Sequence, residues 1–181
     1  MNAVRLVQAG LKRVPHYGPL WFAAFRIHER IEASKGGLPL ALRLPQTRAA
    51  LASALQALPP ELRWKVHFVA AQMEARVAAA AREAKPAEAH RCLKNSRAAF
   101  MHSANACPVN LRWKVRVAAA RVELRIANIK EARRLLSRAL AEAPLKYRSQ
   151  VLIEAATLEE LCGKEDDARR LLDPSKLICD D

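Results

Sequence analysis

The sequence has little glycine, few aromatic residues and only short runs of β-branched residues. Glycine supplies 5 of the 181 residues, and Phe, Trp and Tyr together supply 5%. Alanine, leucine and arginine dominate instead, and all three are strong helix formers. The composition therefore predicts an all-α chain.

Motifs of the common enzyme and metal sites are also missing. The sequence has no glycine-rich phosphate loop, no Cys-x-x-Cys, no His-Glu-x-x-His and no serine between glycines. His90 and Cys92, which with His102 and Cys107 form the one potential metal cluster, would diverge by about 200° on a helix. We therefore predict a protein that is not an enzyme, with no catalytic residue, no cofactor and no metal.

The cysteines lack the spacing of a disulfide framework. The four are Cys92, Cys107, Cys162 and Cys179. A helix-rich sequence does not need disulfide bonds, so a reducing compartment is expected. No apolar run approaches the length that crosses a bilayer, and no membrane contact is predicted.

Acidic residues are missing from the N-terminal region. The first is Glu29, and the cations that precede it are Arg5, Lys12, Arg13 and Arg26. Such a composition is typical of an organellar transit peptide. However, Ala3 to Pro15 has the same residue spacing as Ala132 to Pro144. We therefore interpret the N-terminal region as part of the fold.

What the chain does contain is a repeated pattern. The pentapeptide Leu-Arg-Trp-Lys-Val occurs at residues 62–66 and again at 111–115, and Ala-Arg-Arg-Leu-Leu occurs at 132–136 and 168–172. Self-similarity at a roughly fixed period indicates stacked helical repeats. The structural repeat positions are Trp21, Trp64, Trp113, Pro59, Pro108 and Pro144. Cations flank Trp64 and Trp113, but their helical spacing favours core packing over a cation–π role.

The prolines and the apolar periodicity set the helix limits. We predict helices at about 2–14, 17–35, 46–58, 61–84, 87–105, 109–127, 129–142, 146–162 and 164–173. Pro15, Pro59, Pro108 and Pro144 fall between helices, because proline lacks an amide proton and has a fixed φ. The helix before Pro86 is expected to be overlong. Gly163 is predicted to end a helix as a C-cap.

We predict one helical-repeat domain over residues 1–181. Its approximate units are 1–35, 46–85, 87–127 and 129–178. Residues 34–46 hold two of the 5 glycines and two of the 10 prolines, and an ordered insertion with packed leucines is expected there. A linker between two domains is the alternative. The chain opens on the second helix of a repeat, which indicates a segment of a longer array with uncapped ends that favour self-association.

A helical wheel of residues 111–126 places apolar side chains on two opposite sides. One side holds Trp113, Val117, Ala120 and Leu124, and the other holds Val115, Ala119, Val122 and Ile126. We therefore expect both sides to be buried. The polar flanks are Arg112, Arg116 and Glu123 on one edge, and Lys114, Arg121 and Arg125 on the other. Residues 62–77 repeat this design, with Arg63, His67 and Glu74 opposite Lys65, Gln72 and Arg76.

The charge balance favours a polyanionic partner. Lysine and arginine number 31 against 18 acidic residues, which gives a net charge of +13. Such an excess suits RNA or an acidic protein segment. Superposed repeats would align the flanks into a basic strip, whose candidate contacts are Lys65, Arg76, Lys114, Arg121 and Arg125, then Arg63 and Arg112. The competing interpretation is that the flanks form ladders of salt bridges, with Glu74 or Glu123 paired to an arginine of a neighbouring helix.

The repeat pattern resembles the half-a-TPR (HAT) repeat, a TPR-like helix pair of RNA-processing factors. The matching residues are Ala132, Arg133, Leu135, Leu136, Arg138, Ala139, Leu140 and Pro144, with a Glu about ten residues after the aromatic position, as in Trp64 with Glu74 and Trp113 with Glu123. The chain is most similar to the solenoids of Prp6-type pre-mRNA splicing factors. It departs from the pattern at Ser149, which replaces the aromatic residue. The resemblance implies a right-handed α-solenoid of antiparallel helix pairs, a TPR/HAT-like superhelix.

The resemblance also implies a function. A non-enzymatic scaffold in an RNA-processing or ribonucleoprotein assembly, such as that of mRNA splicing, is expected. Its partners would be other protein subunits, and single-stranded RNA would contact the basic strip. The alternative is a TPR-like adaptor that docks an acidic protein helix or peptide and never touches RNA. A nuclear location follows from the first interpretation, and the mitochondrion or chloroplast is the alternative location.

Overall fold

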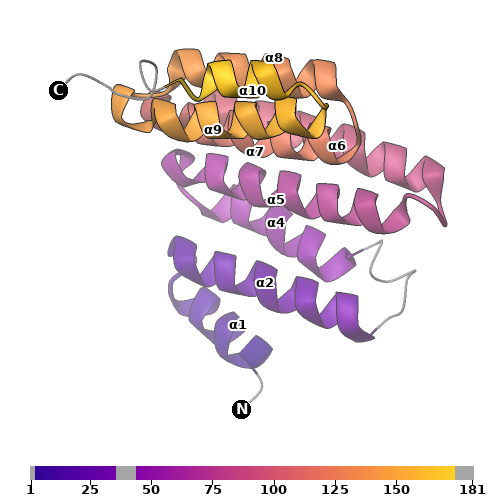
Figure 1. Cartoon of the computed structure of the whole chain (residues 1–181). Coiled ribbons are helices and arrows are strands. Elements are labelled where there is room, and N and C mark those ends of the chain that lie inside the picture. Colours follow the sequence, from indigo (N-terminus) through magenta and orange to yellow (C-terminus); the bar gives the residue numbers. More distant parts are fainter. Residues whose placement is uncertain (1–2, 36–43, 174–181) are drawn as a thin grey trace. The chain divides into compact units, whose positions relative to one another are not determined.

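The computed structural model describes residues 3–35 and 44–173, and these residues form helices and the short turns between them (Figure 1). The helices are α1 (Ala3–Arg13), α2 (Gly18–Lys35), α4 (Pro45–Ala57), α5 (Pro60–Ala81), α6 (Pro86–Ala106), α7 (Val109–Arg125), α8 (Ile129–Glu142), α9 (Leu145–Leu161) and α10 (Glu165–Leu171). No described residue is in a strand. The predicted all-α fold is confirmed.

The chain divides into two compact units, Met1–Ala106 and Cys107–Asp181. Within each unit, helices pack against their neighbours in sequence order, with α5 against α6 and α7 against α8 as the most extensive pairs. This is the arrangement of a TPR-like helical-repeat array, as the repeat pattern predicts. The predicted limits of the individual repeats and the predicted continuation into a longer array stay predictions.

Apolar side chains from α2, α4, α5 and α6 form the core of the first unit. Phe25, Leu58, Val66 and Met73 are each at most 1% exposed. Two buried serines of α6 attach this helix to α5, because Ser96 Oγ and Ser103 Oγ donate hydrogen bonds to main-chain carbonyls of α5 at 2.8 and 2.9 Å. Buried hydroxyl groups need such partners, so these bonds fix how α6 lies on α5.

A buried carboxylate of α2 caps the start of α4. Glu32 accepts hydrogen bonds from the main-chain amides of Gln46 and Thr47 at 2.6 and 3.0 Å, and from Thr47 Oγ1 at 2.7 Å. The first amides of a helix lack intrahelical partners, and a negative charge there is favourable. Leu44 is 2% exposed, so the expected packing of the insertion's leucines is confirmed for this one. The others, at positions 38, 40 and 42, lie outside the described residues.

The second unit has its core between α7, α8 and α9. Trp113, Val117, Ala120 and Leu136 are buried there together. On the opposite side of α7, Val115 and Ala119 are buried as well. The prediction that both sides of this helix are buried is therefore confirmed.

The prolines at the repeat positions share one backbone geometry. Pro59, Pro108 and Pro144 each directly precede a helix, with φ between −62° and −52° and ψ between 141° and 154°. Each carbonyl accepts a hydrogen bond from the amide three residues later, at 2.8 to 3.0 Å. The predicted role of these prolines between helices is confirmed.

The helices α5, α7 and α9 end in two kinds of turn. The helix α5 ends at Ala81, three residues short of the predicted limit, and residues 82–84 form a turn before Pro86. The helix α7 ends in a tight turn in which Ala127 has a φ of 61°, and α9 ends in the equivalent turn with Gly163 at 72°. The predicted glycine cap is therefore confirmed. Alanine at the equivalent position is strained, because its Cβ disfavours the left-handed region.

Candidate polyanion-binding surface

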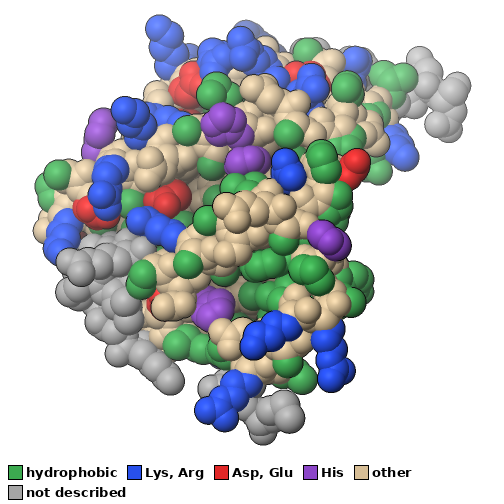
Figure 2. Space-filling view, turned by 180° about the vertical axis from the view of Figure 1, so that it is seen from behind, with side chains coloured by type: hydrophobic (Ala, Val, Ile, Leu, Met, Phe, Trp, Pro, Cys, Tyr) green, Lys and Arg blue, Asp and Glu red, His purple; other side chains and the backbone are tan. Residues whose placement is uncertain are grey.

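The predicted cations on the polar edge of α7 are exposed to solvent. Lys114, Arg121 and Arg125 are all exposed in the second unit, whereas Arg112 and Arg116 are half-buried. In the first unit, Arg63, Lys65 and Arg76 are exposed. On the face shown in Figure 2, lysine and arginine side chains are spread widely over the surface and acidic side chains are fewer. The exposure of Lys114, Arg121 and Arg125 agrees with the helical wheel, whereas Glu74 and Glu123, which it placed on the polar flanks, are buried.

Two of the predicted contacts are occupied by acidic residues of the same unit. Arg76 makes two hydrogen bonds of 2.8 Å with the carboxylate of Glu29 on α2. Arg121 makes a similar two-bond contact with Glu154 on α9, one bond being 2.9 Å long. The Arg121 hydrogen bond lowers the pKa of Glu154. Paired guanidinium groups offer less charge to a polyanion than free ones do.

Salt bridges between helices also occur on the other edge of these helices. Arg48 pairs with Glu74 at 3.0 Å, Arg116 pairs with Glu142 at 2.6 Å, and a further pair joins Arg133 and Glu159. The competing interpretation of the flanks, a series of salt bridges, is therefore confirmed for Glu74. Glu123 accepts a hydrogen bond of 2.7 Å from the side chain of Asn128.

Three of the five cations named first for the strip make no ion pair within residues 3–35 and 44–173. These are Lys65, Lys114 and Arg125. Lys65 Nζ lies 5.6 Å from the centre of the Trp64 ring, and Lys114 Nζ lies 5.4 Å from that of Trp113. Such contacts at exposed sites contribute only about 0.5–1 kcal/mol, so both ammonium groups stay accessible to a ligand.

The two remaining candidates, Arg63 and Arg112, have different environments. Arg63 Nε donates a hydrogen bond of 3.1 Å to the carbonyl of Leu58, which precedes Pro59 at the start of α5. Arg112 Nε is buried and has no hydrogen-bond partner within the described part of the chain. The Nε of Arg63 is occupied by a carbonyl and that of Arg112 is buried, so these two arginines are weaker candidates than Lys65, Lys114 and Arg125.

Each tryptophan of the repeat pattern has a different environment. Trp113 is 4% exposed, as expected for a core residue, and its ring stacks on that of Tyr147 with centres 5.2 Å apart. Trp21 is partly buried and donates a hydrogen bond of 2.7 Å to the carbonyl of Pro15. Trp64 is also partly buried. Core packing is therefore confirmed most clearly for Trp113.

Sequence reasoning missed Tyr147 and Lys146. Lys146 Nζ lies 5.0 Å from the centre of the Tyr147 ring, and Lys114 Nζ lies 5.5 Å from it. Tyr147 follows Pro144 by three residues, and the same position after Pro59 and Pro108 is held by Leu62 and Leu111. An aromatic residue in place of a leucine at this position was the available signal.

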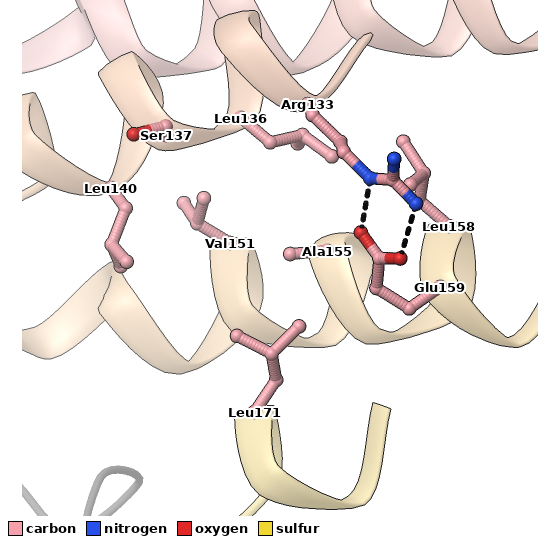
Figure 3. Close-up of a pocket in the computed structure, with 9 residues that line it drawn as sticks. All are labelled: Arg133, Leu136, Ser137, Leu140, Val151, Ala155, Leu158, Glu159 and Leu171. Atoms are coloured by element: carbon pink, nitrogen blue, oxygen red, sulfur yellow. Dashed lines mark hydrogen bonds and ion pairs between the residues drawn. The ribbon is translucent and has the colours of Figure 1, made fainter. Parts of the chain in front are cut away.

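An apolar groove lies among α8, α9 and α10 of the second unit (Figure 3). Its volume is about 310 Å³. Leu136 and Leu140 of α8, Val151 of α9 and Leu171 of α10 line it. The Arg133–Glu159 ion pair closes one end, as the dashed lines in Figure 3 show. This is enough room for one or two large apolar side chains of a partner.

The described residues contain no group of three or more His, Cys, Asp or Glu side chains that could hold a metal ion. The closest histidine pair, His67 and His102, has ring centres 5.4 Å apart. Burial and the neighbouring charge of His102 lower the pKa of His67. None of the helices in the described part of the chain is both long enough and apolar enough to span a membrane.

Comparison with known proteins identifies similar sequences. The family model described as PRP6, TPR-like domain matches residues 1–180. A TPR-containing protein of Dictyostelium discoideum is 41% identical over 75 residues, which is 41% of this chain and 5% of that protein. The chain thus spans a small part of the length of this relative. No solved structure matches significantly.

Proposed function

The chain belongs to the PRP6 TPR-like domain family, and from that premise we propose that it is a non-catalytic scaffold in a pre-mRNA splicing assembly. Its helix pairs would hold other protein subunits, and its location would be the nucleus. We further propose that it contacts RNA directly through Lys65, Lys114 and Arg125, which are exposed and make no ion pair among the described residues.

The observation that carries the RNA contact is the distribution of ion pairs. Of the cations on the predicted polar edges, Arg76 and Arg121 are held by carboxylates of their own unit. Lys65, Lys114 and Arg125 have no such partner among the residues described. An unpaired lysine or arginine releases counterions from a nucleic acid when it binds, and that release supplies sequence-independent affinity. The proposal that these cations form one strip along the array stays a prediction.

The second candidate function is an adaptor that docks a protein segment and does not touch RNA. The groove of the second unit favours it, because Leu136, Leu140 and Leu171 offer an apolar surface beside the Arg133–Glu159 pair. A partner helix with one or two large apolar side chains and acidic neighbours would fit this surface. Self-association through the ends of the array is a further proposal.

Fluorescence anisotropy with a labelled single-stranded RNA, measured at several salt concentrations, tests the proposed RNA contact. The slope of log affinity against log salt is about −0.7 per phosphate contact for single strands. The variant Lys65→Ala, Lys114→Ala, Arg125→Ala should therefore bind more weakly, with a slope about 2 units shallower.

A matched control removes the same number of positive charges elsewhere. Arg82, Lys94 and Lys130 are exposed and lie outside the two polar edges. Changing these three to alanine should leave the slope within about one unit of the original. If the unmodified protein does not bind RNA at low salt, or if both triple variants lose affinity equally, the proposed RNA contact is wrong.

A further inference from the structure

An aromatic pair supported by the core lies at the start of α7 and α9. The Trp113 and Tyr147 rings stack with their centres 5.2 Å apart and their planes at 27°. Trp113 belongs to the buried core of the second unit, whereas Tyr147 is partly exposed. The buried ring therefore holds the outer ring in a fixed orientation, as a rigid binding surface requires.

Positive charge surrounds the outer ring. Lys114 and Lys146 place their ammonium groups 5.5 and 5.0 Å from the centre of the Tyr147 ring, and both lysines are exposed. Arg148 on the same turn is exposed as well. These side chains are long and flexible, so they can leave the ring at a small cost and contact an anion beside it.

The segments on either side of Trp113 and Tyr147 contain no acidic residue, and the acids at the ends of the second segment are paired with arginines. Residues 107–122 and 143–153 contain no acidic residue. The acids that bound the second segment are Glu142 and Glu154, and each makes a two-bond ion pair with an arginine of α7. The start of these two helices therefore carries a local excess of positive charge around an aromatic face.

We propose that Tyr147 is a stacking platform for a base of single-stranded nucleic acid, with Lys114 and Lys146 contacting the adjacent phosphates. This inference rests on the proposed RNA contact and deepens it. It assigns a residue that stacks on a base, in addition to the cations that contact the phosphate backbone. Single-strand binders combine these two elements in the same way, and each stacked base contributes substantially to affinity.

The observations favour a nucleic acid over an acidic peptide. Carboxylates of a peptide would satisfy the lysines but would leave the ring face without a planar partner. A nucleotide supplies both groups at a fixed spacing, with an anionic phosphate next to a planar base. RNA and single-stranded DNA share this chemistry, and binding to an oligonucleotide of each kind would separate them.

The test compares a uridine oligonucleotide with an abasic oligonucleotide of the same length. The intact protein should bind the uridine oligonucleotide about 5- to 10-fold more tightly, because stacking is lost without the base. Tyr147→Leu should remove this preference and leave the salt slope unchanged. Tyr147→Phe should keep the preference, since the ring face remains. Lys114→Ala with Lys146→Ala should instead make the salt slope about 1.4 units shallower.

The chain provides a matched control in its other tyrosine. Tyr17 is 56% exposed in the first unit, and Tyr17→Leu should leave the base preference unchanged. Thermal unfolding of each variant checks that it folds, and the base preference of the intact protein needs no variant at all. If the intact protein binds RNA but does not prefer the uridine oligonucleotide, or if Tyr147→Leu retains the preference, the platform alone is wrong.

Two other outcomes would overturn more than the platform. If the intact protein binds neither oligonucleotide, the proposed RNA contact and the platform are both wrong. If a polyglutamate peptide competes for the surface as well as uridine RNA of equal charge does, the ligand is an acidic peptide and the platform is again wrong.

Discussion

The same pentapeptide has two different environments in this protein. In the first unit, Trp64 is partly buried, and the adjacent Lys65 lies over its ring. In the second unit, Trp113 is buried and stacks on Tyr147. The arginine before each tryptophan differs too. Arg63 bonds to a main-chain carbonyl, whereas Arg112 Nε is buried without a partner among the described residues.

The difference arises from the neighbouring helices. Three residues after the tryptophan, the first unit has His67 against His102 of α6, and the second has Arg116 paired with Glu142 of α8. A repeated sequence determines which side chains lie on each side of a helix. The residues that those side chains contact belong to other segments, which are not repeated. The comparison therefore separates what a repeat motif determines, its helical register, from what it does not, its contacts.

The largest expected difference is in the cost of removing each tryptophan. Trp113→Ala should lower the free energy of unfolding by about 3–5 kcal/mol, because a fully buried ring leaves a cavity and Tyr147 loses its stacking partner. Trp64→Ala should cost less than about 2 kcal/mol, since that ring is only partly buried. Urea denaturation followed by circular dichroism measures both. Equal losses would show that the two environments are energetically alike.

The next difference concerns the residue three positions after each tryptophan. Arg116→Ala should lower the free energy of unfolding by about 1–2 kcal/mol, because it leaves the half-buried carboxylate of Glu142 without its partner. His67→Ala removes only a ring contact and should cost less. Arg148→Ala, an exposed arginine of the second unit, is the control. If Arg116→Ala lowers the free energy of unfolding by no more than Arg148→Ala does, this prediction is wrong.

The third comparison is between the ends of α7 and α9, which both belong to the second unit. Ala127 is exposed and has a φ of 61°, a conformation that costs alanine about 1–2 kcal/mol. Glycine is more flexible when unfolded, which offsets part of the gain. Ala127→Gly should therefore raise the free energy of unfolding by about 0.5–1 kcal/mol, as thermal denaturation would measure. Gly163→Ala should act in the opposite direction. A destabilising Ala127→Gly would indicate that this turn is not strained.

The smallest difference is in the response to acid. The pKa of His67 is lowered in the folded state, so the unfolded chain binds a proton first. The stability from a neutral His67 is therefore present above the ordinary pKa of about 6.5, and it decreases as the pH falls from there through the lowered value. The decrease should be small, because the His67 ring is only partly buried and solvent screens its interactions. Urea denaturation at pH 7.5 and at pH 5.5 measures it, and His67→Asn should reduce it.

The stability of the second unit should depend on pH in a more acidic range than the contribution of His67 does. Hydrogen bonds from Arg121 and Arg133 lower the pKa values of Glu154 and Glu159, respectively. Their contribution is present above the ordinary glutamate pKa of about 4.3 and is lost as the pH falls through the lowered values. A loss of stability between pH 7.5 and 5.5 that persists in His67→Asn would assign the effect to other groups.

Much of the fold was predictable from the sequence, because its signals are local. Pro59, Pro108 and Pro144 mark the start of α5, α7 and α9, and the apolar periodicity predicted two buried sides of α7. The end of α5 was predicted three residues late, since the alanines before Pro86 carry no signal of where the helix ends. Alanine favours helix at every position of that run.

The candidate site was less predictable. The wheel predicted that Arg76 and Arg121 would be exposed, but their carboxylate partners are 47 and 33 residues away in the sequence. Nothing local in the sequence relates such distant residues to each other. Tyr147 was missed for the same reason. Its stacking depends on Trp113, and this contact exists only because α9 packs beside α7.

The shared geometry of the prolines has a consequence for building longer arrays. The backbone angles of Pro108 and Pro144 differ by only a few degrees, from φ −52° and ψ 141° to φ −56° and ψ 148°. A copy of residues 109–144 inserted after Pro144 would follow and end on prolines with nearly the same backbone angles. This stretch is therefore a candidate module for tandem duplication. Each copy would add another Trp113 and Lys114, whereas Tyr147 lies beyond Pro144 and would still occur once.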